Sequence, residues 1–374
     1  MDIKELSIRI NPYLKRQILI APFDSETPRS FDERFDFEII RIKSPHIRYN
    51  IPIISGFINN IFFYFKVFQE LKRLSDIDLI QTHEITPIAY SCILGKILRV
   101  PVIGMIHGTA EAYSRIAGLR ETILATLFKP TYAIVVDSGT RAPEKFRKIW
   151  GDRVTVVNHG IDTELFKPKD KNESILRHLD LKRSDLIILS ISSLIPIKNI
   201  DVAIEAFEKV ITEITDPRIF LLIAGDGSQK EELVKLVDEK RLANRVKFLG
   251  PIKNDQVPDY ISIADICIGM SLKDNMNRSV LEPMACAKPI VAFGGGSIDE
   301  LITTGYNGLL AKRGDILDFA EKMKLLLENP ELRRDMGKHA HETIVEKRSW
   351  NARIQQDLAA YWKVIGLCLE VNRS

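Results

Sequence analysis

The sequence predicts an α/β protein with two doubly wound domains, each built on a mostly parallel sheet. Short apolar runs alternate along the chain with segments of helical spacing, which is typical of parallel strands joined by crossover helices. Several runs are apolar throughout, as expected for strands that are covered on both faces. The chain has 374 residues, which suits two or three domains at about 150 residues each.

The first half of the chain contains six candidate strands. They are residues 17–21, 37–41, 79–82, 102–106, 133–136 and 154–157. Residues 3–13 precede them and are expected to form a short helix, since Pro12 disfavours a long regular element. The polar stretch 167–174 follows the last of these strands and is interpreted as an inter-domain linker, because it contains a proline and lacks apolar periodicity.

The second half repeats the alternation. Its candidate strands are residues 186–191, 219–224, 246–249, 266–269, 289–292 and 308–311, and its candidate helices include 200–212, 230–240 and 316–327. Residues 350–369 are expected to form one or two terminal helices, with Trp350, Tyr361 and Trp362 as packing anchors. In such domains ligands bind beyond the carboxyl ends of the strands, so the chemistry is expected in the loops that follow them.

Composition excludes several classes of protein. Apolar residues make up 45% of the chain and the net charge is only +3, so disorder and bulk nucleic-acid binding are both disfavoured. No long uncharged apolar stretch is present and none begins the chain, so we expect neither a membrane span nor a secretory signal. The four cysteines form no CxxC pair, which favours a reducing, cytoplasmic setting over a zinc or disulfide framework.

The loop between two strands of the second half is the most informative stretch. After the run that ends at Gly269, a polar loop with Asn275 leads into a helix that is expected to start near Arg278. A helix start presents free N–H groups and a partial positive charge, which suits a phosphate. Asp274 and Glu282 bracket this start and could bind sugar-nucleotide hydroxyls. The alternative is a capped helix with a surface acid.

Other nucleotide motifs are missing. The segment 222–227 is a strand followed by a Gly-rich turn, but it is not GxGxxG, and no Walker sequence GxxxxGK[ST] occurs. Asp76 and Asp78 spell D-x-D, yet they come before a strand, so we interpret them as a turn and expect no metal site.

Several motifs in order resemble those of the retaining glycosyltransferases of family 4, which have the GT-B fold. The family's G-R-L-x-x-x-K is similar to Ser-Ser-Leu-Ile-Pro-Ile-Lys at 192–198, and its E-x7-E corresponds to Asp274 and Glu282. Further matches are Ala-Gly-Asp-Gly at 224–227, Val-Lys-Phe-Leu-Gly at 246–250, Gly-Tyr-Asn-Gly at 305–308 and Asn-His-Gly-Ile-Asp at 158–162. The resemblance implies two Rossmann-like domains that face each other across a cleft.

The resemblance also implies roles for individual residues. Lys198 matches the lysine on the donor diphosphate, Glu282 matches the acid on the ribose hydroxyls, and Asp274 takes the place of the acid on the donor sugar. The remaining donor-binding positions implied by the resemblance are Ser193, Gly227, Ile252, Asn275, Ser279 and Val280.

On the acceptor side, the resemblance implies that His107 hydrogen-bonds the sugar near the reacting carbon. His107, Asp274 and Lys198 would then be the catalytic residues, with His83 and Gly108 beside the acceptor. From the residues alone, a His-Gly pair after a strand is more often structural.

Two features depart from the family pattern. Its diphosphate-binding arginine is Ser193 here, which offers a hydrogen bond without charge, and Arg278 is a candidate to compensate. The family also begins with a strand, a Gly-rich loop and a helix, and residues 1–17 are too short for such a unit. We therefore expect the first domain to be reduced.

Residues 51–74 are apolar and aromatic and end in Lys72 and Arg73. As a helix this segment would have an apolar face bordered by bases, which is one way to touch the inner membrane face. The alternative is an ordinary helix that packs on the sheet.

These observations predict an acceptor-binding domain at residues 1–168, a nucleotide-sugar-binding domain at 169–345, and a helical segment at 346–374 that packs back on the first domain. The expected activity is retaining transfer of a hexose from a nucleoside-diphosphate sugar to a hydroxyl of a glycan or lipid-linked acceptor, in polysaccharide or glycoconjugate synthesis. No cofactor is expected. A nucleotide-sugar epimerase on the same fold and a non-catalytic partner subunit are the alternatives.

Overall fold

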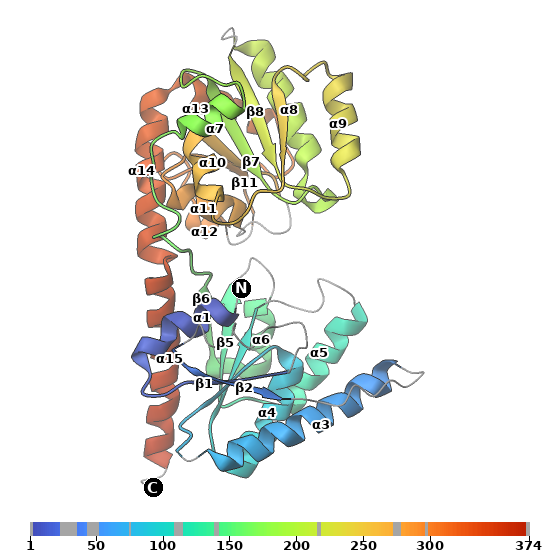
Figure 1. The fold of residues 1–374 in the computed structure, drawn as a ribbon, viewed down its shortest axis with the longest axis vertical. Coiled ribbons are helices and arrows are strands. Elements are labelled where there is room, and N and C mark those ends of the chain that lie inside the picture. The colour runs from blue at the N-terminus through green and yellow to red at the C-terminus, as the bar shows by residue number, and fades with distance from the viewer. Residues whose placement is uncertain are drawn as a thin grey trace. The chain divides into compact units, whose positions relative to one another are not determined.

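The computed structural model describes residues 3–22, 36–42, 52–74, 76–107, 115–137, 142–214, 218–271, 278–295 and 298–371. The chain forms two compact units (Figure 1). One contains most of the chain up to residue 157 together with residues 354–374, and the other contains 158–353. Both are built on parallel strands, so the predicted α/β class is confirmed. None of the described helices combines the length and the apolar character that a membrane crossing requires.

The second unit is built on a six-stranded parallel sheet with the order β12-β11-β10-β7-β8-β9. The strands are β7 (Leu186–Ile191), β8 (Ile219–Ala224), β9 (Val246–Gly250), β10 (Ile266–Gly269), β11 (Ile290–Phe293) and β12 (Leu309–Ala311). The order reverses direction between β7 and β10. In doubly wound sheets the crevice beside such a reversal is where ligands bind.

Helices cover both faces of this sheet. They are α7 (Glu173–His178), α8 (Ile200–Glu213), α9 (Lys230–Glu239), α10 (Val257–Ile263), α11 (Arg278–Ala285), α12 (Ile298–Leu301), α13 (Ile316–Glu328) and α14 (Pro330–Lys347). The side chain of Ile188 in β7 is buried in the core beneath α8, α9 and α13. The side chains of its neighbours Ile187 and Leu189 are buried in the core beneath α10 and α11. Successive residues of one strand therefore enter opposite cores, which explains why the strand is apolar throughout.

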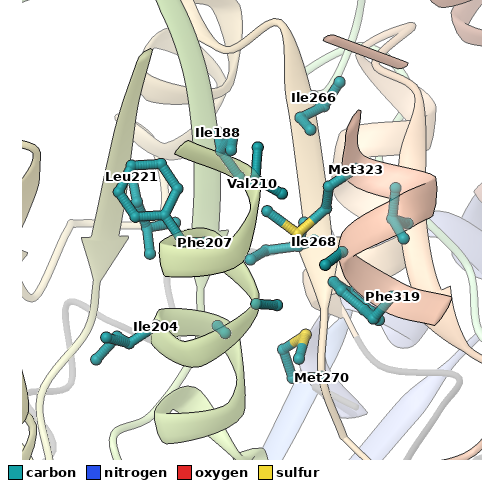
Figure 2. Packing of buried hydrophobic residues seen from close by; sticks show 14 of the residues in the cluster. Ile188, Ile204, Phe207, Val210, Leu221, Ile266, Ile268, Met270, Phe319 and Met323 are labelled. Carbon is teal, nitrogen blue, oxygen red and sulfur yellow. The ribbon is translucent and has the colours of Figure 1, made fainter. Parts of the chain in front are cut away.

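Figure 2 shows the first of these cores. Phe207 and Val210 of α8 belong to one buried cluster with Phe319 and Met323 of α13. All four side chains are fully or almost fully buried, and burying side chains of this size stabilises a fold by about 1.5–3 kcal/mol each. This packing sets the positions of the strands and thereby of the loops at their carboxyl ends.

The first unit contains a four-stranded parallel sheet with the order β3-β4-β5-β6 and a separate parallel pair, β1-β2. Its strands are β1 (Ile18–Pro22), β2 (Glu38–Ile42), β3 (Ile80–His83), β4 (Val102–Ile106), β5 (Tyr132–Asp137) and β6 (Val154–Asn158). Its helices are α1 (Ile3–Ile10), α3 (Pro52–Arg73), α4 (Ile85–Leu98), α5 (Arg115–Leu127) and α6 (Ala142–Trp150). The expected helix near the N-terminus is α1, followed by the 3-10 turn η1 (Asn11–Tyr13).

All twelve predicted strands are present, each within one residue of its predicted ends. The predicted boundary between the first and second domains lies at 168/169, whereas the first compact unit ends at residue 157 and the second resumes at residue 158. Phe166 is buried in the second unit, and Lys169 and Lys171 form ion pairs of 2.9 Å with Asp259 and Asp265. Residues 167–174, which the sequence analysis interpreted as an inter-domain linker, therefore lie within the second compact unit, where these charges are paired.

The C-terminal segment forms one helix, α15 (Trp350–Val371). Its residues from 354 onward belong to the first compact unit, whereas the predicted boundary was at 345/346. Trp350 and Tyr361 are buried, but Trp362 is 66% exposed. The expectation that Trp362 anchors packing is wrong. Trp362 directly follows the buried Tyr361, and adjacent residues of an α-helix project from different faces.

The two faces of α13 provide a test of the core. Leu326 is fully buried and Leu317, on the same helix, is 61% exposed. We expect Leu326→Ala to lower the free energy of unfolding of this unit by about 2–5 kcal/mol, because it leaves a cavity. Leu317→Ala is the matched control and should change it by less than about 0.5 kcal/mol. Hydrogen exchange at the amides of β7 and β8 measures the free energy of unfolding of this unit separately from the other. Equal changes in that free energy in the two variants would contradict the packing described here.

Candidate active site

The loops that follow β7, β8 and β9 are joined by backbone hydrogen bonds. The N–H of Ser192 donates to Ala224 O at 2.9 Å, and the N–H of Leu194 donates to Asp226 O at 2.9 Å. The N–H of Gly225 donates to Gly250 O at 2.8 Å, which joins the start of the loop after β8 to the last residue of β9. The backbone is therefore connected across the carboxyl ends of these three strands.

This close approach requires glycine at two positions. A Cβ at residue 225 would lie 1.8 Å from Ser192 O, and Gly225 has a φ of +137°. A Cβ at residue 227 would lie 2.4 Å from Leu194 O. Gly227, which the sequence assigned to donor binding, thus has a clear packing role. Predicted donor residues Ser193 and Ile252 lie on the same loops, with Ser193 exposed and Ile252 partly buried against the core.

Lys198 lies where the sheet order reverses. It ends the 3-10 turn η4 (Pro196–Lys198), and Asn199 follows in the left-handed conformation. The Asn199 amide donates to Met270 O at 3.0 Å, and so fastens the loop after β7 to the end of β10. The lysine is therefore held at the reversal point, half-buried at the carboxyl edge of both central strands.

Helix α11 starts at the same edge. Val280 is buried, and its Cγ2 would lie 2.8 Å from a Cβ at Gly269, so the helix packs closely on the end of β10. Ser279 and Val280 belong to the first turn of this helix, the end that carries a partial positive charge. The predicted donor-site positions Asp274 and Asn275 lie outside the described residues, as does Gly108 on the acceptor side.

Glu282 is 4% exposed and is paired with Arg278 one turn earlier. The Arg278 guanidinium also donates to the side-chain carbonyl of Asn254, in the loop after β9. Burial raises the pKa of the Glu282 carboxyl, and the Arg278 charge opposes part of that rise. One arginine therefore connects the buried acid to the neighbouring loop. No motif in the sequence pointed to Asn254.

Two histidines lie together in the first unit. His83 ends β3 and His107 follows β4, the adjacent strand. The His83 Nδ1 atom lies 2.9 Å from His107 Nε2, and the two rings are nearly parallel, with centroids 5.3 Å apart and an interplanar angle of 6°. Both are residues that the sequence placed on the acceptor side. The carboxyl ends of neighbouring parallel strands bring them together.

Two further side chains extend this pair. The Gln81 Nε2 atom lies 3.1 Å from His83 Nε2, and the Tyr361 hydroxyl donates to Gln81 Oε1. Gln81 could have been found from sequence, because residues two apart on a strand share a face. Tyr361 could not, since it comes from α15. Within the described parts of the chain, no group of three or more His, Cys, Asp or Glu side chains could hold a metal ion.

The Arg278–Glu282 pair can be tested by titration. We expect Arg278→Met to raise the pKa of Glu282 further, because it removes the favourable charge but keeps the alkyl stem. The carboxyl carbon of Glu282, followed by NMR against pH, measures this. Arg183→Met, at an exposed arginine of the same unit, is the control and should leave the titration unchanged. A wild-type pKa at or below that of an ordinary glutamate would contradict the effect of burial.

Comparison with known proteins agrees with this architecture. Residues 171–343 match the family model described as Glycosyl transferases group 1, and residues 18–165 match the one described as Glycosyltransferase Family 4. The N-acetyl-alpha-D-glucosaminyl L-malate synthase of Bacillus anthracis is 25% identical over 300 residues, which are 79% of this chain and 77% of that protein.

Solved structures show the same fold. HepE of Anabaena, in complex with UDP and glucose, has a TM-score of 0.72 at 22% identity, and the match covers 95% of this chain and 94% of that one. The sucrose-phosphate synthase of Thermosynechococcus elongatus has a TM-score of 0.73 at 19% identity, with 98% and 93% covered. Since the two family models match successive parts that together make up most of the chain, this protein belongs to the glycosyltransferases of the family 4 type, with the GT-B fold.

Proposed function

We propose that the protein transfers a hexose, with retention of configuration, from a nucleoside-diphosphate sugar to a hydroxyl group of a glycan or lipid-linked acceptor. The proposed setting is synthesis of cell-surface polysaccharide or glycoconjugate on the cytoplasmic side of the membrane. The observation that carries the proposal is the grouping of Lys198, Glu282 and the first turn of α11 at one edge of the sheet, around the β7–β10 reversal.

Each of these groups suits a different part of the donor. The Lys198 ammonium would bind the diphosphate, whose negative charge grows as it leaves. The N–H groups of Ser279 and Val280 would bind phosphate oxygens at the helix start. The Glu282 carboxylate would accept hydrogen bonds from the ribose hydroxyls. Asp274 is proposed to contact the donor sugar.

The proposed reaction needs no protein nucleophile. The bond between the anomeric carbon and the diphosphate oxygen breaks, and the acceptor oxygen bonds to that carbon on the same face. The acceptor's proton passes to the departing phosphate, which then leaves as the nucleoside diphosphate. The protein orients the reactants and stabilises charge. We propose that cationic side chains and helix N–H groups serve here in place of a metal or other cofactor.

Arg278 is the proposed substitute for the arginine that Ser193 replaces. It lies at the start of α11 and its side chain is 64% exposed. In that position its guanidinium could exchange the Glu282 carboxylate for a donor phosphate. On the acceptor side, His107 is proposed to donate a hydrogen bond to the sugar, with His83 beside it.

Binding and transfer can be separated experimentally. We expect UDP to raise the melting temperature of the wild type in a screen of nucleoside diphosphates, because a ligand of the native state stabilises it. HepE, a structural neighbour, was solved with UDP, which makes it the first nucleotide to test. We expect Lys198→Ala and Glu282→Gln each to reduce transfer more than tenfold, with Lys235→Ala, at an exposed lysine of α9, as the control.

NMR of the product shows the anomer that forms. Near-normal transfer in both site variants would overturn the site assignment. An inverted anomer would exclude the retaining path, and an epimerised nucleotide sugar in place of a transfer product would favour an epimerase.

We also propose that the first unit contacts an anionic membrane surface, where lipid-linked sugars reside. Four exposed apolar residues follow one face of α5: Ile116, Leu119, Ile123 and Leu127, which are 51–83% exposed. The adjacent α4 exposes Ile93 and Ile97. Helix α3 packs Val67 and Leu71 into the core, and it exposes Ile61, Phe62 and Phe65. One face of α3 therefore packs in the core, and we propose that the other face contributes to the membrane contact.

Co-sedimentation with vesicles tests the membrane proposal. We expect the protein to pellet with anionic vesicles and less with neutral ones, since Arg115, Arg120 and Lys129 lie on or beside α5. The double variant Leu119→Ser/Ile123→Ser should weaken pelleting at least tenfold, whereas Leu317→Ser in the other unit should not. Equal recovery in the supernatant with and without vesicles would reject the contact.

A further inference from the structure

The two histidines of the first unit belong to a chain of four hydrogen-bonded side chains. Tyr361 of α15 bonds to Gln81 of β3, Gln81 bonds to His83 at the end of the same strand, and His83 bonds to His107 after β4. Tyr361 is 5% exposed and the other three are half-buried. Residues that are 280 positions apart in the chain are therefore joined directly.

The orientation of the Gln81 amide sets the direction of this chain. Its Nε2 atom lies 3.9 Å from the Met105 sulfur as well as 3.1 Å from His83 Nε2. A thioether accepts hydrogen bonds and cannot donate them. The NH₂ end of the amide therefore faces Met105 and His83, and its carbonyl oxygen accepts from the Tyr361 hydroxyl.

The proton positions on both rings follow from this orientation. A neutral imidazole has one N–H donor and one acceptor nitrogen. Because Gln81 donates to His83 Nε2, that nitrogen is the acceptor and the proton of His83 is on Nδ1. The His83 Nδ1–H then donates to His107 Nε2 across 2.9 Å. His107 Nε2 is consequently an acceptor, and its own proton is on Nδ1.

We propose that Gln81 and Tyr361 are positioning residues that act through His83 and hold His107 as a neutral hydrogen-bond donor at Nδ1. This inference rests on the proposed function for its consequence in catalysis. With Nε2 occupied by His83 and Nδ1 protonated, the His107 ring can donate a hydrogen bond from Nδ1 and has no free nitrogen that could remove the acceptor's proton. That proton goes to the departing phosphate.

NMR of protein with ¹⁵N-labelled histidine tests the proton positions without any substrate. In the wild type, at a pH where both rings are neutral, we expect the protonated nitrogen of both His83 and His107 to be Nδ1. A wild-type His107 with its proton on Nε2 overturns the proposal, and this measurement needs no variant.

Gln81→Glu tests the direction of the chain. A carboxylate only accepts, so we expect the His83 proton to move to Nε2 and the His107 proton to move to Nε2 as well, where it donates to His83 Nδ1. Gln256→Glu, which makes the same charge change at an exposed site of the other unit, is the matched control and should leave both rings unchanged. Unchanged protonation of His107 in Gln81→Glu contradicts the proposal.

Kinetics connect the tautomer to transfer. We expect Gln81→Glu to lower kcat at least tenfold while the donor KM and the thermal shift with UDP change less than twofold, because the proposed donor residues lie in the other unit. We expect Tyr361→Phe to lower kcat by a smaller factor, since Met105 still orients the amide.

If no nucleotide binds and no transfer occurs, the proposed function fails, while the NMR result still decides the proton positions. If the His107 proton moves to Nε2 in Gln81→Glu and kcat is unchanged, the role assigned to His107 in transfer is wrong, while the proposed function still holds.

Discussion

The close contact between main chains at the carboxyl edge of the second unit is the constraint on which the rest of this half depends. Gly225 and Gly227 let the loop after β8 lie against residues 192–194, at distances that no Cβ would allow. The backbone bonds that result hold the loop after β7 in place, and that loop carries Ser193 and Lys198. A charged side chain at a fixed position binds a phosphate more tightly than a mobile one does, because the entropy of ordering it is lost during folding and not on binding.

The same edge shows how a buried acid can be kept beside a helix start. Glu282 is almost fully buried, which disfavours its charge, and Arg278 compensates from one turn away. Arg278 also reaches Asn254, so the loop after β9 is connected to α11 by one side chain. A carboxylate that is paired with an exposed guanidinium has a partner that can be exchanged for a ligand.

The first unit places its polar groups by a different means. Parallel pairing sets His83 opposite Met105, so that His107 lies just beyond the end of the neighbouring strand. The side chains of Gln81 and Met105, from the same two strands, then determine which nitrogen of His83 can accept. The strand register thus controls the chemistry of a ring that lies outside the strands.

The sequence by itself determined the twelve strands, the main helices and the family, because apolar runs and motif spacing are local properties of the chain. It also indicated Lys198 and Glu282 through the family motifs that they match, and the two histidines through their positions at the ends of neighbouring strands. It did not determine the boundary at 157/158, because the charges of residues 167–174 resemble a linker until their partners Asp259 and Asp265 are known. Nor could it join Tyr361 to Gln81 or Arg278 to Asn254. Those contacts connect distant segments, and only the packing of the folded chain brings them within hydrogen-bonding distance.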